Sequence, residues 1–205
     1  MKTLLKNFCV LMSAIAVIGI ASCTNQATNN NDNAADSTQQ ALAQKVQPTT
    51  IEEAIECFLV DSLGSNYDKA DLCVPECRII ATDDSNPDSI KVWGDFWVMN
   101  YNVAGDTLKT ASGGNYPGMI QLRKTDEGYM VTGMDQVADG SDNTPSAKRI
   151  FGTFYEKYSA TAANEKDREQ ARMASIARFA NKQGLNVTCY QDFGWPAVPI
   201  TPPAH

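Results

Sequence analysis

Apolar residues at helical spacing mark the start of the folded part of the chain. Between residues 50 and 63 they fall on one side of a helix: Ile51, Ala54, Ile55, Phe58 and Leu59. Gly64 and the polar residues after it end this helix. A second, short helix is predicted from residue 66 or 68 through Leu72, before Pro75. The first part of the fold is therefore predicted to be a helical hairpin.

The pattern then changes to aromatic and β-branched residues, which favour strands. The clearest run, Ile90–Val103, predicts one long strand. Turns rich in Gly and Asp separate it from shorter runs. Gly113-Gly114 and Pro117-Gly118 predict bulges or a bend. Strands are predicted at 78–82, 90–103, 107–111, 119–124 and 129–137.

Helical spacing returns after residue 145. One helix is predicted from Ser146, with Ile150, Phe151, Phe154 and Tyr158 on one side. A second is predicted from an Asn164 cap, with Met173, Ile176, Ala177 and Ala180 on one side. The join is compatible with one continuous helix, so one or two helices are possible. Residues 185–190 predict a closing strand. The whole order predicts an α+β fold with a helical C-terminal extension.

The first 22 residues have the features of a secretory signal peptide. Two lysines precede a run of about 13 apolar residues, which is shorter than the roughly 20 that span a bilayer. Ile20-Ala21-Ser22-Cys23 resembles the bacterial lipobox, which implies cleavage before Cys23 and lipid attachment to that cysteine. Residues 23–49, rich in Asn, Gln, Ala and Thr, then predict a disordered tether.

Charge and histidine content exclude several function classes. The net charge is −7, and loss of Lys2 and Lys6 with the signal peptide makes it −9. An acidic surface repels phosphate backbones, so we expect no nucleic-acid binding. The single histidine, His205, stands at the C-terminus. This argues against Ser-His-Asp or Cys-His catalysis and against multi-histidine metal sites. We expect no metal and no cofactor.

Two segments resemble parts of the nuclear transport factor 2-like superfamily, also called cystatin-like or ketosteroid-isomerase-like. Ile55–Leu59 followed by Tyr67–Ala70 resembles the first helical hairpin of exported members, and Ile120–Lys124 with Gly128–Val131 resembles the closing β-hairpin. The resemblance covers residues 50–138 and leaves 139–205 as an extension. It implies a curved antiparallel sheet wrapped around a helix, with a cone-shaped pocket. Members include isomerases, dehydratases, binding modules and assembly subunits, so the fold alone does not give the function.

Turn geometry predicts which strand residues share a face. A two-residue turn at Asp126-Glu127 pairs Lys124 with Tyr129 and Leu122 with Val131. A similar turn at Gly105-Asp106 pairs Val103 with Leu108. Without a bulge, one aromatic face follows, which we assign to the concave side with Ile120. Its pocket candidates are Trp93, Asp95, Trp97, Tyr101, Tyr129 and Asp135. A bulge near Gly113-Gly114 would reverse the assignment between strands.

Two of these candidates carry carboxylates. Asp95 and Asp135, if they point into an aromatic pocket, would have a raised pKa and could act as an acid or base. Tyr101 or Tyr129 could polarise a carbonyl group, as a tyrosine does in ketosteroid isomerase. Core packing is the competing interpretation for the aromatic residues, and solvation for the aspartates. No catalytic residue is assigned.

Four cysteines remain after Cys9 is removed and Cys23 is lipidated: Cys57, Cys73, Cys77 and Cys189. An even number in an exported chain favours disulfides. Cys57 and Cys73 lie eight residues either side of Ser65, so a helical hairpin would bring them level. We favour Cys57–Cys73 with Cys77–Cys189. A Cys73–Cys77 bond and buried free thiols are the alternatives.

Three functions are open from the sequence. The first is a non-enzymatic, lipid-anchored binding module of the cell envelope, with a pocket for a small apolar ligand or a peptide segment. The second is an envelope assembly protein or homodimer that docks through Phe151, Phe154 and Tyr158. The third is a cofactor-free isomerase or dehydratase that uses Asp95 or Asp135. The expected location is the outer membrane of a bacterium, facing the periplasm.

Overall fold

A computed structural model describes residues 47–201 as an α+β fold with a mixed, seven-stranded sheet. The predicted signal peptide, Cys23, most of the tether and His205 lie outside the described residues. The strands are β1 (Leu72–Asp83), β2 (Ile90–Ala104), β3 (Thr107–Asn115), β4 (Gly118–Thr125), β5 (Gly128–Gln136), β6 (Cys189–Gln191) and β7 (Val198–Pro199). The α-helices are α1 (Ile51–Phe58), α2 (Asn143–Phe151), α3 (Tyr155–Ala163) and α4 (Glu165–Lys182).

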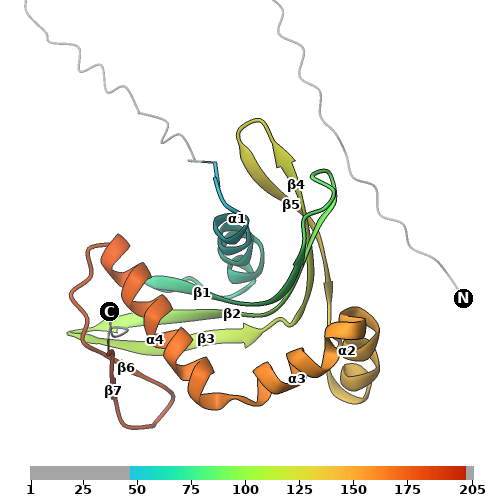
Figure 1. Ribbon diagram of the computed structural model, residues 1–205. Coiled ribbons are helices and arrows are strands. Elements are labelled where there is room, and N and C mark those ends of the chain that lie inside the picture. Colours follow the sequence, from blue (N-terminus) through green and yellow to red (C-terminus); the bar gives the residue numbers. More distant parts are fainter. Residues whose placement is uncertain (1–46, 202–205) are drawn as a thin grey trace, which may run out of the picture. The chain divides into compact units, whose positions relative to one another are not determined.

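The long strand β2 organises the sheet. β1 pairs with one edge of β2 along almost its whole length. The other edge of β2 is shared by two strands: β3 pairs with Trp97–Ala104 and β4 with Ile90–Gly94. β5 extends the β4 end, and β6 followed by β7 extends the β3 end. The sheet bends strongly between its two ends and curves around α1 (Figure 1).

Helix α1 lies inside this curve. Thr50 caps it in a capping box with Glu53, whose side chain accepts from the backbone N–H of Thr50. Its buried residues pack on the inner face of the sheet, against Ile90, Val92, Phe96, Val98, Ile120 and Leu122. A π-helical turn (Leu59–Leu63) and a 3-10 turn (Gly64–Asn66) end the helical segment. The inner face is therefore filled by a packed core.

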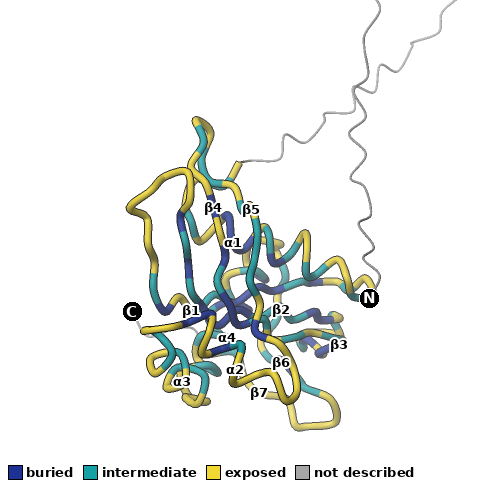
Figure 2. Tube along the Cα trace, turned by 90° about the vertical axis from the view of Figure 1, so that its right-hand side faces the viewer, coloured by how far each residue is buried: buried dark blue, intermediate teal, exposed yellow. Residues whose placement is uncertain are grey.

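Helices α2, α3 and α4 lie on the outer side of the curve (Figure 1). Ile176 and Ala180 of α4 pack against residues of β1, β2, β3 and β6: Leu72, Val74, Tyr101, Leu108 and Tyr190. A separate cluster joins α2 and α3 to the β4 end of the sheet through Ile80, Phe151 and Trp93. Buried residues are concentrated on the strands, and exposed residues on the loops (Figure 2).

The predicted helical hairpin is wrong in its second half. No helix runs from residue 66 to Leu72; β1 begins at Leu72 instead and continues through Pro75 to Asp83. The reason is pairing with β2, which satisfies the backbone of this whole segment and overrides the short helical pattern. Pro75 is tolerated because, within the described residues, β1 pairs only with β2 and so is an edge strand.

Other sequence predictions are confirmed. Val103 pairs with Leu108, Leu122 with Val131 and Lys124 with Tyr129, as the two turns predict. Asn164 accepts a hydrogen bond from the Asp167 backbone N–H and starts α4, so α4 is separate from the helix before it. The single helix predicted from Ser146 through Tyr158 is wrong, because Gly152, with a φ of 51°, divides it into α2 and α3. The closing strand is shorter than predicted, with only Cys189–Gln191 paired to β3.

Candidate functional site

The predicted aromatic face lies on the outer side of the sheet. Val92 pairs with Ile120, and Trp93 pairs with Met119, so Ile120 shares a face with Val92 and not with Trp93. The expectation that Trp93, Asp95, Trp97 and Tyr101 accompany Ile120 on the concave side is wrong. The reason is a one-residue bulge at Ala111: the register between β2 and β3 shifts between Asn100 and Tyr101, and the shifted register continues from β3 into β4. A bulge was expected to reverse the faces if it lay near Gly113-Gly114, and it lies slightly earlier in β3.

The other two pocket candidates lie on opposite faces of β5. A register shift between Gln121 and Leu122 leaves Tyr129 on the inner face and puts Asp135 opposite Met119 on the outer face. Asp135 accepts two hydrogen bonds from Arg149, at 2.8 and 3.1 Å. These bonds hold its pKa below the ordinary value, which is opposite to the raised pKa expected from the sequence.

Asp95 is buried, and both of its carboxylate oxygens accept hydrogen bonds. It forms an ion pair with Arg78 on β1. It also accepts hydrogen bonds from Asn115 Nδ2 at 2.6 Å and from the indole N–H of Trp97 at 3.3 Å. Arg78 is held from its other side by the Thr161 carbonyl oxygen at the end of α3. Asp95 is therefore part of the structure that ties α3 to the sheet.

A cleft of about 440 Å³ opens beside this cluster, between the outer face of the sheet, α4 and the turn that follows β6. Cavities of roughly 300–1,000 Å³ are typical of small-molecule sites. Of the predicted pocket residues, only Trp97 lines it. The other lining residues are Glu76, Met99, Thr110, Arg168, Glu169, Arg172, Asp192, Phe193 and Trp195.

Glu76 lines the cleft and is 5% exposed. Its Oε1 atom has no hydrogen-bond partner among the described residues; it forms an ion pair at 3.6 Å with Nε of Arg78, which also lacks a hydrogen bond there. The pKa of Glu76 is raised to about 7, mainly by burial and also by the nearby Asp95, against the opposing effect of Arg78, Arg172 and Arg168. A buried carboxyl oxygen without a hydrogen bond is costly, so Oε1 of Glu76 is an acceptor open to a donor in the cleft.

Arg172 forms the wall of the cleft on α4. Its Nε donates to the Tyr101 hydroxyl at 2.9 Å, and its two terminal nitrogens hold Asp192 at 2.8 and 2.6 Å. Thr110 donates to Asp192 at 2.6 Å, and these bonds, those from Arg172 first, lower the pKa of Asp192. Arg172 therefore fastens the turn after β6 to the sheet and shapes the mouth of the cleft.

Arg168, one helical turn earlier on α4, differs from Arg172 in its contacts. Its guanidinium carbon lies 5.5 Å from the centre of the Trp97 ring, a cation–π distance. Within residues 47–201 its side chain has no hydrogen bond or ion pair to a carboxylate. A half-buried guanidinium with all its N–H groups available is a ready receptor for an acceptor-rich ligand.

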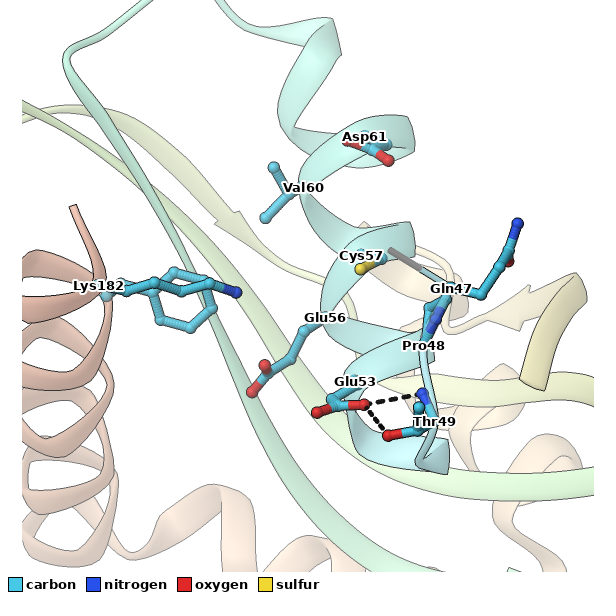
Figure 3. Close-up of a pocket in the computed structure, with 10 residues that line it drawn as sticks. Gln47, Pro48, Thr49, Glu53, Glu56, Cys57, Val60, Asp61 and Lys182 are labelled. Carbon is cyan, nitrogen blue, oxygen red and sulfur yellow. Dashed lines mark hydrogen bonds between the residues drawn. The ribbon is translucent and has the colours of Figure 1, made fainter. Parts of the chain in front are cut away.

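A second cavity, of about 330 Å³, lies between α1 and the end of α4 (Figure 3). Cys57, Val60 and Phe179 are among its lining residues. Its acids already have partners: Glu53 accepts from the backbone and hydroxyl of Thr49, and Glu56 forms an ion pair with Arg178. The second cavity therefore lacks the unpartnered buried group that distinguishes the outer cleft.

The favoured disulfides are not formed, since Cys73, Cys77 and Cys189 are free thiols. Cys73 lies on β1 and not on a helix, so the hairpin argument for Cys57–Cys73 fails. Cys73 and Cys77 are separated by four strand residues, about 13 Å, beyond the reach of a disulfide. Cys77 and Cys189 are farther apart. Cys77 pairs with Phe96 on β2, and Cys189 pairs with Thr107 on β3, whose own partner on β2 is Ala104. Phe96 and Ala104 are about 26 Å apart along β2.

Most of the residues that line the cleft could not be identified from the sequence. Glu76 is not among the predicted site residues because the sequence predicts no strand over residues 72–77. The available signal was the alternation of this acid with the apolar residues Leu72 and Val74. Arg168 and Arg172 lie on one face of a helix, three to four residues apart, which is also the pattern of a solvated surface. Neither the scan against protein-family models nor the searches of curated proteins and solved structures found a match to this chain.

Proposed function

We propose that this chain is a lipid-anchored binding module of a bacterial cell envelope, which holds a small ligand in the cleft beneath α4. The observation that carries the proposal is Oε1 of Glu76, buried in the lining of a cavity of about 440 Å³ and without a hydrogen bond. Folded proteins satisfy nearly all buried polar atoms, so a group left unsatisfied in a cavity indicates an occupant.

The anchoring part of the proposal rests on Ile20–Cys23 and its resemblance to a lipobox. None of the helices between residues 47 and 201 combines the length and hydropathy needed to cross a bilayer. In the proposal, the acyl chains on Cys23 hold the chain at the periplasmic side of the outer membrane, and residues 24–49 connect the anchor to the domain.

We also propose that the domain is a variant of the cystatin-like cone. A bent sheet that curves around α1 supports this (Figure 1). The inside of the curve is filled by core residues such as Ile55, Leu59 and Phe96, all fully buried. The proposed ligand site is therefore on the outer face, where α4 covers the sheet incompletely.

Native followed by denaturing mass spectrometry of the purified full-length protein tests the proposal. Extra mass on the native protein, released on denaturation, is the expected result. Trp97→Leu removes a ring that lines the cleft and should abolish retention. Phe154→Leu is the matched control, because Phe154 packs against Trp93 on the same face but outside the cleft. Two results together would overturn the proposal: no extra mass on the native protein, and no compound in a ligand screen whose binding is weakened by Trp97→Leu.

A second candidate is an interaction surface at the turn after β6. Phe193 and Trp195 are 69% and 72% exposed, which is unusual for such large rings. The surface expected from the sequence is less suitable, since Phe151 is buried and stacks on Tyr158 while Phe154 packs on Trp93. Light scattering of the wild type and of Phe193→Ser/Trp195→Ser tests this candidate: a dimer that the double variant dissociates supports it, and a monomer in both argues against homodimerisation.

The isomerase or dehydratase hypothesis gains no support from its two aspartates. Asp95 is paired with Arg78, and Asp135 with Arg149, so neither is a carboxylate held in an apolar pocket.

A further inference from the structure

We infer that the outer cleft binds a carboxylate carried on an aromatic ring, with the carboxylate on Arg168 and the ring against Trp97. This inference rests on the proposed binding function and names its ligand class. It follows from three observations: which charges in the cleft are already paired, what faces Glu76, and where the apolar surface of the cleft lies.

The pairing of charges favours an anionic ligand. Asp192 is held by Arg172 and Thr110, and Glu169 accepts a hydrogen bond from the Tyr190 hydroxyl. Asp95, next to the cleft, is held by Arg78 and Asn115. A cationic ligand would find only Glu76 without a hydrogen bond, and burial favours the neutral form of that carboxyl group; at the other acids it would have to displace a partner. An anionic ligand needs only the N–H groups of Arg168, which have no acceptor among the described residues.

Glu76 can add a hydrogen bond to the same carboxylate. The charged groups that face it are Arg78 and Asp95 from the sheet and Arg168 and Arg172 from α4. With a pKa of about 7, Glu76 is protonated in a large part of the molecules near neutrality, and a protonated carboxyl is a hydrogen-bond donor. An anion bound beside it would favour the protonated form still more, so binding should take up protons.

The rest of the ligand meets flat apolar surfaces. Trp97 presents its ring beneath Arg168, and Phe193 and Trp195 line the outer side of the same cleft while remaining mostly exposed. Aromatic rings between such surfaces gain from burial and from offset stacking. A planar ring of indole size therefore suits the space between the sheet and the turn better than a flexible polar ligand.

Three probes with the same ring and different charge test the inference: indole-3-acetate, indole-3-ethanol and tryptamine. Isothermal titration calorimetry of the full-length protein at pH 7.5 measures each affinity, and repetition in phosphate and Tris measures proton exchange. We expect indole-3-acetate to bind at least about tenfold more tightly than indole-3-ethanol, as a charge-assisted hydrogen bond allows. We expect net proton uptake with indole-3-acetate only.

Variants assign these effects to residues. Arg168→Ala should abolish the preference for indole-3-acetate while indole-3-ethanol binds as before, which also shows that the variant is folded. Glu76→Gln should retain binding of indole-3-acetate and lose the proton uptake. Arg123→Ala, an exposed arginine on β4 outside the cleft, is the control and should match the wild type in all three titrations.

Equal or tighter binding of indole-3-ethanol or tryptamine would overturn the inference, and so would proton release with indole-3-acetate. Failure of all three probes would overturn it too. The proposed function would survive each of these results if mass spectrometry shows a retained ligand that Trp97→Leu removes. A retained ligand without charge would show directly that the binding function holds and that the inferred ligand class is wrong.

Discussion

Glu76 on β1 and Trp97 on β2 are direct partners across the two strands, and both side chains line the cleft under α4. Partners on one face of an antiparallel pair lie about 5 Å apart at Cβ, so the acid and the indole form one continuous floor. Asp95, two residues before Trp97, is paired with Arg78, two residues after Glu76. Asp95, at one end of this polar strip, is therefore paired within the sheet, and Glu76, at the other end, lines the cavity.

Glu76 should give the protein a defined pH dependence of stability. Its pKa is raised from 4.5 to about 7 in the folded state, so between these values the folded chain binds more protons than the unfolded chain. The free energy of unfolding should therefore fall as pH rises from about 4.5 to 7, by up to about 3 kcal/mol at 1.36 kcal/mol per pKa unit. Urea unfolding of the wild type and of Glu76→Gln at pH 4 and pH 8 measures this.

The difference between the two chains isolates Glu76 from other groups. Asp135 and Asp192 have lowered pKa values and act in the opposite direction, but they are present in both chains and cancel. We expect Glu76→Gln to gain stability relative to the wild type between pH 4 and pH 8. A difference that stays constant over this range would show that Glu76 ionises normally.

The sequence predicted the parts of this fold that local chemistry decides. The turns at Gly105 and Gly128 and the aromatic β2 run could be recognised because turn type and strand propensity depend on neighbouring residues. The assignment of faces could not, because it depends on two register shifts, one between Asn100 and Tyr101 opposite β3 and one between Gln121 and Leu122 opposite β5, which the partner strands set. The cleft could not be predicted for the same reason: Glu76, Arg168 and Asp192 are brought together only by the tertiary fold.

Arg172 should contribute much more stability than Arg149. Arg172→Met removes hydrogen bonds to Tyr101, Thr110 and Asp192, and leaves Asp192 with only the hydrogen bond from Thr110. Because the Asp192 side chain is 37% exposed, we expect a loss of about 2–3 kcal/mol, below the value for a fully buried pair. Urea unfolding at pH 7 measures the loss.

Arg149→Met is the matched control for Arg172→Met. Arg149 also holds an aspartate with two hydrogen bonds, but its side chain is 62% exposed. Exposed ion pairs contribute little, so this variant should unfold within error of the wild type. Hydrogen exchange should show faster exchange of β6 in Arg172→Met alone. Equal losses in the two variants would contradict the role of Arg172 in fastening the turn after β6.

The free thiols of β1 should react slowly. Burial raises the pKa of Cys73 to about 11 and raises that of Cys77 well above its ordinary value, so neither forms the reactive thiolate near neutrality. Iodoacetamide at pH 8 should label Cys189, which is half-buried on the short strand β6, before it labels Cys73 or Cys77. Peptide mass spectrometry over time measures the order. A Cys57–Cys73 peptide in a non-reducing digest would contradict the free thiols.

Gly128 and Gly105 should differ in their tolerance of a side chain, although both have positive φ, at 142° and 66°. A Cβ on Gly128 would lie 2.0 Å from the carbonyl oxygen of Pro48, which accepts a hydrogen bond from Tyr129. A Cβ on Gly105 would meet nothing within 4 Å. Gly105→Ala should therefore cost only the backbone term of about 1–2 kcal/mol, whereas Gly128→Ala should cost clearly more and should loosen the segment that leads into α1. Thermal unfolding measures the two losses, and hydrogen exchange at α1 should rise only in Gly128→Ala; equal losses and an unchanged α1 would show that the contact with Pro48 does not constrain the start of the helix.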